Sequence, residues 1–212
     1  MPKYNRFKYI YPPRPENTIP PTDLDFWDNG SLIAQPKLNG SNCEIYTNGV
    51  DYFVMNRHKQ RLTNFKIEQH ELAELYRGDG GWIVINGEYM NKSKRDENGN
   101  VFNHKFVIFD ILVFENDYLV GSTFKQRVSL LDDIYGKVEC EKDYLYKISE
   151  NIYRVKTYET GFDSLYNIFI TIDMLEGLVM KRGNAKLEIG LTEKNNVKTQ
   201  LKCRKPTKNY KY

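Results

Sequence analysis

The sequence predicts an α+β fold with largely antiparallel sheets and flanking helices. Three observations support this prediction: a hairpin signal at Asn48-Gly49, several strand-like apolar runs that follow it, and three segments of helical periodicity. The helical segments fall between pairs of strand-like runs. Strands in runs, with helices between pairs of them, are typical of α+β proteins.

The first segment, residues 1–22, is expected to be an extended or turn-rich lead-in and not a regular element. Five prolines lie between residues 12 and 21, and each fixes φ and removes a backbone donor. The runs 43–47 and 50–55 then flank Asn48-Gly49, a signal for a type I′ turn, which needs positive φ at both central residues. Further strands are expected at 82–90, 105–114, 177–182 and 199–205, with a polar loop at 96–100.

Helices are expected over 64–77, 123–135 and 161–175. The first repeats apolar residues on one face and ends at Gly78, which suits a helix stop. The second opens with Thr123-x-x-Gln126, the pattern of a capping box. The third carries aromatic and aliphatic residues at helical spacing.

Length and composition exclude several classes of protein. The 212 residues suffice for one domain, or for one with a small appendage. A hydrophobic content of 40%, with 16 Tyr and 11 Phe, excludes disordered, collagen-like and coiled-coil chains. No apolar run reaches the roughly 20 residues of a membrane span, and the N-terminus does not resemble a secretory signal. We therefore expect no membrane partner.

The cysteines and histidines give no sign of a structural metal. Cys43, Cys140 and Cys203 fit neither a zinc motif nor a disulfide framework, which indicates a reducing compartment. The three histidines are scattered, so surface or core positions are favoured over metal ligation: His58, His70 and His104.

Basic residues gather at both ends of a chain whose net charge is only +3. Residues 1–15 contain four basic side chains and 198–212 contain six, and neither stretch contains an acid. This distribution suits a polyanionic partner, but two solvated termini explain it equally well.

The most informative segment runs from Pro36 through Lys37, Asn39 and Gly40 to Asn42. A lysine after the apolar run 32–34, with a glycine close behind, can project into a cleft. Desolvation or cationic neighbours there would lower its pKa and make it a nucleophile. Taken alone, a surface lysine beside a turn is the simpler interpretation.

Four later segments, in order, change that balance. Glu88 lies on a strand after an apolar run, Phe109 lies in a strongly apolar strand, and Glu176 begins a strand that ends in a basic pair. In the last segment Lys202 and Arg204 alternate, so they face one side of a strand.

Together these segments resemble the five signatures of the covalent nucleotidyltransferase superfamily, which contains ATP-dependent DNA ligases, RNA ligases and mRNA capping enzymes. The resemblance covers residues 37–205. It implies one adenylation domain over 1–212, with a central, ATP-grasp-like cleft for ATP. It also implies that Lys37 attacks the α-phosphorus of ATP, expels pyrophosphate and holds AMP through a phosphoramide bond.

The resemblance assigns roles to the other residues as well. Glu88 would bond the ribose, Phe109 would stack on the base, and Glu176 would bind Mg²⁺ or Mn²⁺, directly or through water. Carboxylates without a Cys/His cluster suit these hard cations better than Zn²⁺. Arg57 would contact a ribose or phosphate oxygen, and Lys181 would contact the nucleotide from the strand that begins with Glu176. Lys202 and Arg204 would neutralise the α-phosphate.

Asn42 indicates which branch of the superfamily is closest. DNA ligases usually carry Arg at this position, whereas Lys-x-Asn-Gly-Ser-Asn is similar to the Lys-x-His-Gly-Thr-Asn pattern of the RNA ligase 2 family, with Asn39 in place of His. An RNA ligase acting on RNA or an RNA-containing nicked duplex is therefore expected. It would pass AMP to a 5′-phosphate and seal to a 3′-OH. The alternatives are a small DNA nick ligase, a GTP-using capping enzyme, and an inactive nucleic-acid-binding module.

The chain ends seven residues after Lys205, where DNA ligases continue into an OB-fold and RNA ligases into a helical domain. An adenylyltransferase core without a C-terminal domain is expected, either shortened from a longer protein or minimal by nature. We expect a monomer that acts in the cytoplasm, and a virus-encoded origin is left open.

Overall fold

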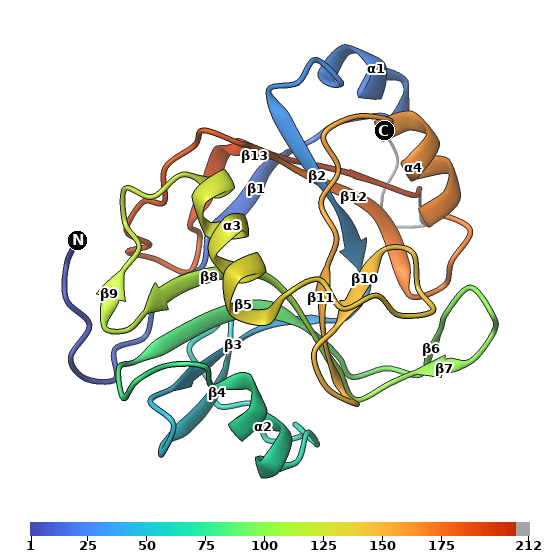
Figure 1. Cartoon of the computed structure of the whole chain (residues 1–212). Helices are drawn as coiled ribbons and strands as arrows, with labels where there is room; N and C mark the ends of the chain where they lie inside the picture. Colours follow the sequence, from blue (N-terminus) through green and yellow to red (C-terminus); the bar gives the residue numbers. More distant parts are fainter. Residues whose placement is uncertain (207–212) are drawn as a thin grey trace.

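A computed structural model describes residues 1–206 of the chain. Two sheets form its framework, a four-stranded sheet in the order β1-β13-β12-β2 and a seven-stranded sheet in the order β10-β11-β8-β5-β3-β4, with β9 beside β8 (Figure 1). The strands of the first sheet are β1 (Arg14–Thr18), β2 (Leu32–Leu38), β12 (Leu175–Arg182) and β13 (Asn196–Arg204). Those of the second are β3 (Ser41–Thr47), β4 (Tyr52–Asn56), β5 (Ile83–Met90), β8 (Lys105–Phe114), β9 (Asp117–Tyr118), β10 (Leu145–Lys147) and β11 (Ile152–Val155).

Most neighbouring strands are antiparallel, and the exceptions are β1 with β13 and β8 with β11. A small hairpin of β6 (Lys94–Arg95) and β7 (Val101–Phe102) stands apart from both sheets and carries the polar loop expected at 96–100. The α+β class predicted from the sequence is confirmed.

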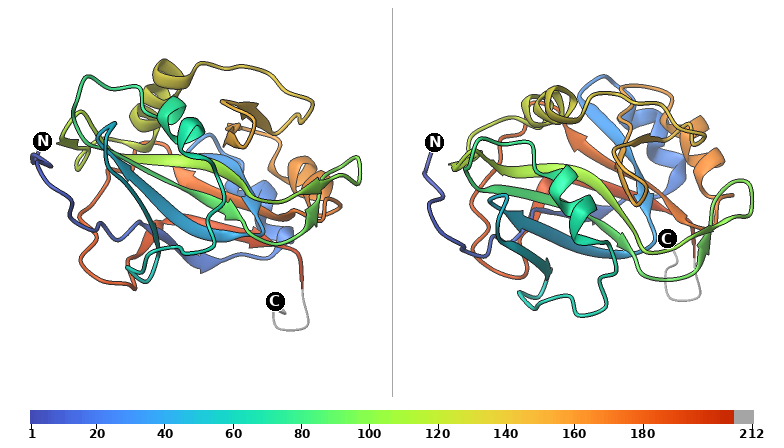
Figure 2. Two further views of the ribbon diagram at one scale, coloured as in Figure 1. Left: turned by 90° about the horizontal axis from the view of Figure 1, so that it is seen from below. Right: turned by 60° about the horizontal axis from the view of Figure 1, so that its bottom comes forward.

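Helices cover the sheets. The helix α3 (Phe124–Tyr135) packs on β8, and α4 (Phe162–Phe169) packs on β12. The left view of Figure 2 shows α2 (Gln69–Leu75) and α3 on the same side of the seven-stranded sheet, and the Tyr135 hydroxyl donates to the Leu75 carbonyl. The short α1 (Leu24–Trp27) follows a 3₁₀ turn at Pro21–Asp23. No helix within residues 1–206 is long and apolar enough to cross a bilayer.

The prediction that residues 1–22 form no element is wrong. Residues 14–18 form β1, which pairs in parallel with β13. Because β1 is the edge strand of its sheet, the missing donor of Pro15 can face away from the ladder, which is where prolines are tolerated. Upstream of it, Tyr4, Tyr9 and Ile10 are buried in the core of the seven-stranded sheet.

The predicted hairpin at Asn48-Gly49 is present, but its loop has four residues and not two. Thr47 pairs with Tyr52, so the second strand begins two residues later than expected. The Asn48 side-chain oxygen accepts hydrogen bonds from the backbone amides of Val50 and Asp51, at 3.0 and 2.7 Å. An asparagine that bonds its own downstream backbone in this way favours the wider loop.

The helix predictions hold at their centres, but α2 begins later and ends earlier than expected, over Gln69–Leu75, and α4 ends early at Phe169. The capping box between Thr123 and Gln126 is formed on both sides. Residues 64–68 are not helical, since the Tyr89 hydroxyl donates to the Asn64 carbonyl and accepts from the Lys66 amide. Residues 170–174 leave the helix, and Leu175 already pairs with Leu38 of β2.

The three cysteines are free, with Cys43 and Cys203 buried. Of the basic ends, Lys3 pairs with Asp117 at 2.6 Å. Lys208 and Lys211, which belong to the basic C-terminal stretch, lie outside the described residues.

Candidate active site

A cleft of about 670 Å³ is lined by side chains from both sheets. This volume lies within the range of about 300–1,000 Å³ that small-molecule sites occupy. All nine residues that the sequence singled out line this one cleft: Lys37, Asn42, Arg57, Glu88, Phe109, Glu176, Lys181, Lys202 and Arg204.

The connection from β2 to β3 joins the two sheets, and Lys37 lies near the end of β2, just before this connection. Gly40 lies in it because its backbone passes close to β5, where a Cβ atom would be 2.6 Å from the Tyr89 carbonyl oxygen. Its amide donates to Glu88 Oε1 at 3.1 Å. The glycine therefore permits a close approach of the backbone to β5.

Lys37 and Glu176 face each other across the pairing of β2 with β12. Lys37 Nζ lies 2.5 Å from Glu176 Oε2, and both side chains are about four-fifths buried, with 22% and 23% of their surface exposed. Arg204 Nη1 lies 3.9 Å from the same oxygen. Glu176 sits at a bulge in β12, beside Gly177 with φ +132°. A Cβ at Gly177 would be 2.3 Å from the Cys203 carbonyl oxygen, so the bulge requires glycine.

Asn39 binds the second oxygen of Glu176, a contact that the sequence did not reveal. With its amide oriented to satisfy both neighbours, its nitrogen donates to Glu176 Oε1 at 3.2 Å and its oxygen accepts from Lys94 Nζ at 3.3 Å. Lys94 also pairs with Asp173 at 2.9 Å. An amide both donates and accepts, so Asn39 can bridge an acid and a base where a carboxylate could not.

Glu88 and Asn42 are paired neighbours on β5 and β3. Burial raises the pKa of Glu88 to about 7, although Lys37 acts in the opposite direction. The Asn42 side-chain nitrogen donates to Asn86 Oδ1 at 2.9 Å and to the Gly87 carbonyl at 3.2 Å. Its oxygen is buried and has no hydrogen-bond partner within residues 1–206. This part of the cleft therefore presents a carboxyl that is readily protonated and a polar oxygen that a ligand could satisfy.

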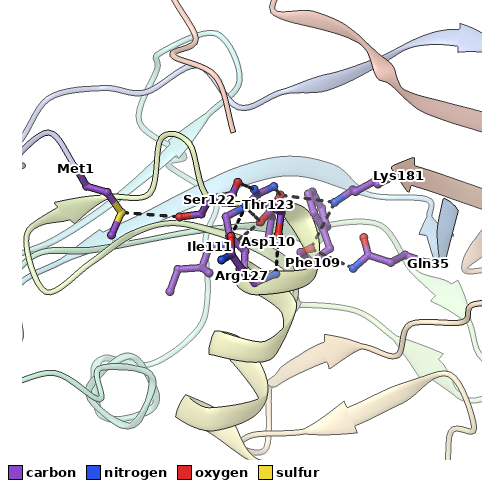
Figure 3. A network of polar contacts seen from close by, with 10 residues as sticks. Met1, Gln35, Phe109, Asp110, Ile111, Ser122, Thr123, Arg127 and Lys181 are labelled. Atoms are coloured by element: carbon purple, nitrogen blue, oxygen red, sulfur yellow. Dashed lines mark hydrogen bonds and ion pairs between the residues drawn. The ribbon is translucent and has the colours of Figure 1, made fainter. Parts of the chain in front are cut away.

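Lys181 is held in the wall of the cleft by protein groups (Figure 3). Its side chain is 5% exposed, with Nζ 3.4 Å from the Phe109 carbonyl and 3.8 Å from Asp110 Oδ2. Burial lowers its pKa to about 8, although Asp110 acts in the opposite direction. Arg127 of α3 binds Asp110 through two nitrogens, at 2.8 and 3.0 Å. Gln35 donates to the Phe109 carbonyl at 3.1 Å, so four elements fix the wall around Phe109.

The sequence alone did not identify Arg127 as part of this network. An acid inside the apolar strand 105–114 signals that some buried partner must exist, but the partner lies on a helix 17 positions away. The rim of the cleft carries Arg57 and His58 in the loop after β4. His58, expected at the surface or in the core, lies at this rim with part of its side chain exposed.

The fold is shared with the nucleotidyltransferase domains of polynucleotide ligases. A structure described as mycobacterial DNA ligase D complexed with ATP and MES superimposes with a TM-score of 0.64 and 13% identity, over 93% of this chain and 62% of that one. The ligase domain of M. tuberculosis LigD gives 0.63 and 13%, over 91% and 59%. A Lig E DNA ligase gives 0.50 and 14%, over 83% and 62%. At such identities the likeness shows the fold, and this chain spans about three fifths of these structures.

Residues 30–200 match the model of the RNA ligase family, and the chain belongs to that family. The resemblance to covalent nucleotidyltransferases expected from the motifs is thereby confirmed. No curated protein matches the chain in sequence.

Proposed function

We propose that this chain is the adenylyltransferase core of an ATP-dependent RNA ligase that acts as a monomer. The observation that carries the proposal is a single cleft in which Lys37 lies at one carboxylate, Glu176, with Arg204 close by. A lysine amine in a cleft that basic residues also line suits attack on a phosphate, because phosphoryl transfer depends mainly on positioning and on positive charge near the phosphate oxygens.

In the proposed reaction Lys37 Nζ forms a bond to the α-phosphorus of ATP, and the bond to the pyrophosphate oxygen breaks. The attacking amine must be neutral, so the ion pair with Glu176 has to open or Glu176 has to accept the proton. Lys202 and Arg204, two positions apart on β13, then neutralise the α-phosphate.

The rest of the cleft suits the sugar and the base. Because its pKa is about 7, the Glu88 carboxyl can either accept or donate a hydrogen bond to a ribose hydroxyl near neutral pH. Phe109 offers an aromatic ring, and Arg57 lies at the rim, where it can reach a ribose or phosphate oxygen. Each of these roles is an assignment that mutation can test.

A divalent cation is implied by this chemistry, and the donor set fits it. Within residues 1–206 no three His, Cys, Asp or Glu side chains are grouped as metal ligands. Mg²⁺ needs no such group, because it is commonly held by one or two carboxylates together with water and substrate phosphates. Glu176 would hold Mg²⁺ or Mn²⁺, and the cation would supply positive charge at the phosphates.

Incubation with α-labelled ATP or GTP and Mg²⁺, followed by a denaturing gel, tests this proposal. We expect a labelled protein band with ATP. A band with GTP alone would indicate a capping enzyme. No band with either nucleotide would favour a nucleic-acid-binding module without turnover.

The RNA preference is the finer part of the proposal and rests on Asn42 and on membership of the RNA ligase family. Proteins distinguish RNA from DNA mainly through the 2′-OH and the A-form shape. The test compares nicked duplexes that differ only in the sugar at the 3′-OH end. Faster sealing with ribose is expected, whereas equal or faster sealing of an all-DNA nick would support a small DNA ligase. A 5′-adenylated strand that accumulates without sealing would show that sealing needs a further domain.

A further inference from the structure

Arg57, His58 and Glu193 form a chain of polar contacts at the rim of the cleft. Arg57 Nε lies 3.3 Å from His58 Nε2, and His58 Nδ1 lies 2.5 Å from Glu193 Oε1. Arg57 and His58 follow β4 of the seven-stranded sheet, while Glu193 precedes β13 of the four-stranded sheet. These contacts therefore connect two loops, one from each of the sheets that line the cleft.

The chemistry of the three groups determines which group donates and which accepts each hydrogen bond. The arginine Nε–H can only donate, and a carboxylate can only accept. A neutral imidazole has one donor and one acceptor nitrogen, so both contacts are satisfied only when His58 carries its proton on Nδ1 and accepts from Arg57 at Nε2. Glu193 thus selects the tautomer that can hold the arginine.

The backbone under His58 is itself well fixed. Asn56 Oδ1 accepts hydrogen bonds from the amides of His58 and Gln60, at 2.9 and 3.0 Å. The Asn56 amide donates to the Gln60 carbonyl at 2.8 Å. In contrast, Arg57 is exposed and has a long side chain whose ordering costs rotamer entropy. A contact that orders this arginine before a ligand arrives lowers the cost of binding.

We propose that His58 is a positioning residue that holds Arg57 toward the nucleotide, and that Glu193 sets the tautomer in which it can do so. The inference rests on the proposed function, in which Arg57 contacts a ribose or phosphate oxygen of ATP. It assigns a role to a histidine and an acid outside the five family signatures.

The kinetic test compares His58→Lys with His58→Gln in the adenylylation assay. A lysine can pair with Glu193 but repels Arg57, and it should raise KM for ATP roughly three- to tenfold, with little change in kcat. A glutamine amide can donate to Glu193 and accept from Arg57, so it should keep KM near the wild-type value. The matched control is His70→Lys, at an exposed histidine that does not line the cleft.

The same change is then made in an Arg57→Ala background. If His58 acts through Arg57, His58→Lys should have no further effect on KM there. An unchanged KM in His58→Lys would overturn the proposal, and so would an equal rise of KM in His58→Gln. The proposal would also fail if His58→Lys raised KM just as much in the Arg57→Ala background.

A second measurement does not depend on activity. Long-range ¹H–¹⁵N spectra in alkaline buffer report the tautomer of each imidazole, and the His58 signals are assigned by their loss in His58→Gln. We expect protonation on Nδ1 in the wild type and a shift toward the other tautomer in Glu193→Ala. A ring protonated mainly on Nε2 would overturn the inference even if the protein labels with ATP. If the wild type forms no adenylate, the proposed function fails. The spectrum still decides whether the contacts between Arg57, His58 and Glu193 are formed.

Discussion

Replacing Arg127 with Met tests the buried ion pair behind the cleft. The Arg127 and Asp110 side chains are only 4% and 2% exposed, and the guanidinium binds both carboxylate oxygens. Methionine keeps much of the apolar stem but removes both of these bonds, and also the bond that Arg127 Nη1 donates to the Ser122 carbonyl at 2.9 Å. The carboxylate of Asp110 is then left with the Ile111 amide and with Lys181, whose Nζ lies 3.8 Å away.

The expected loss follows from what remains at Asp110. Removing one partner of a buried pair typically costs about 3–5 kcal/mol, since the other charge stays buried without compensation. Because Lys181 compensates in part, we expect a loss near the lower end, about 3 kcal/mol of unfolding free energy.

The pKa of Asp110 adds a pH signature to this variant. Burial alone would raise this pKa, but Arg127 and Lys181 outweigh burial and hold it below its usual value. A lowered pKa stabilises the fold above the unfolded-state pKa of about 4, and this stabilisation is lost as the pH falls through the folded-state pKa. The difference between wild type and variant should therefore narrow below about pH 4.

Denaturant unfolding of Arg127→Met, Asp110→Asn and the double variant measures the pair. The double variant should lose much less stability than the sum of the single losses. The control is Lys125→Met on the same helix, where an exposed pair with Glu159 at 3.1 Å should contribute less than about 1 kcal/mol. A loss below about 1 kcal/mol for Arg127→Met, or additive single losses, would refute the reasoning.

Three further predictions concern the cleft itself. Glu176→Ala should weaken the Mg²⁺ dependence and slow adenylylation by roughly 10²–10³-fold, as for the loss of one electrostatic group, and labelling at the wild-type rate would contradict its role. Because burial raises the folded-state pKa of Glu88 to about 7, the protonated carboxyl's contribution to stability is fully present below its ordinary pKa of 4.5 and is lost as the pH rises through 7. The melting temperature of the wild type should therefore fall relative to that of Glu88→Gln between about pH 4.5 and pH 7. A constant difference between the two melting temperatures over this range would contradict a raised pKa of Glu88. Gly40→Ala should lower the free energy of unfolding by about 1–3 kcal/mol, because the new Cβ would lie 2.6 Å from the Tyr89 carbonyl oxygen. Denaturant unfolding that shows no loss would contradict this prediction.

Much of the candidate site could be predicted from the sequence, because its residues lie within or beside short, distinctive motifs. Lys37 and Glu176 are 139 positions apart, and only the pairing of β2 with β12 brings them together. Nothing in the local pattern specifies that pairing. The prediction that the two residues share one site came from the resemblance of all five motifs, taken together, to the superfamily. The partners that the sequence missed, Asn39 with Lys94 and Asp110 with Arg127, depend on tertiary contacts that no spacing records.

The errors in the fold have similar physical causes. Five prolines between residues 12 and 21 led to the prediction of no regular element, although only Pro15 lies within β1 and an edge strand accepts it. Apolar periodicity continued past the end of α4 because Ile172 and Leu175 are buried for other reasons, one in a turn and one in β12. Helix ends and loop lengths are decided by individual side chains, such as the Tyr89 hydroxyl and the Asn48 amide, that compete for backbone groups.

Mass spectrometry of the protein after incubation with ATP and Mg²⁺ tests the central claim most directly. We expect the intact mass to increase by one AMP, with the adduct mapped to the peptide that contains Lys37. The increase should be absent in Lys37→Ala and in Lys37→Arg, because a guanidinium stays protonated and is no nucleophile. An adduct that persists in Lys37→Ala, or that maps to another residue, would contradict the account.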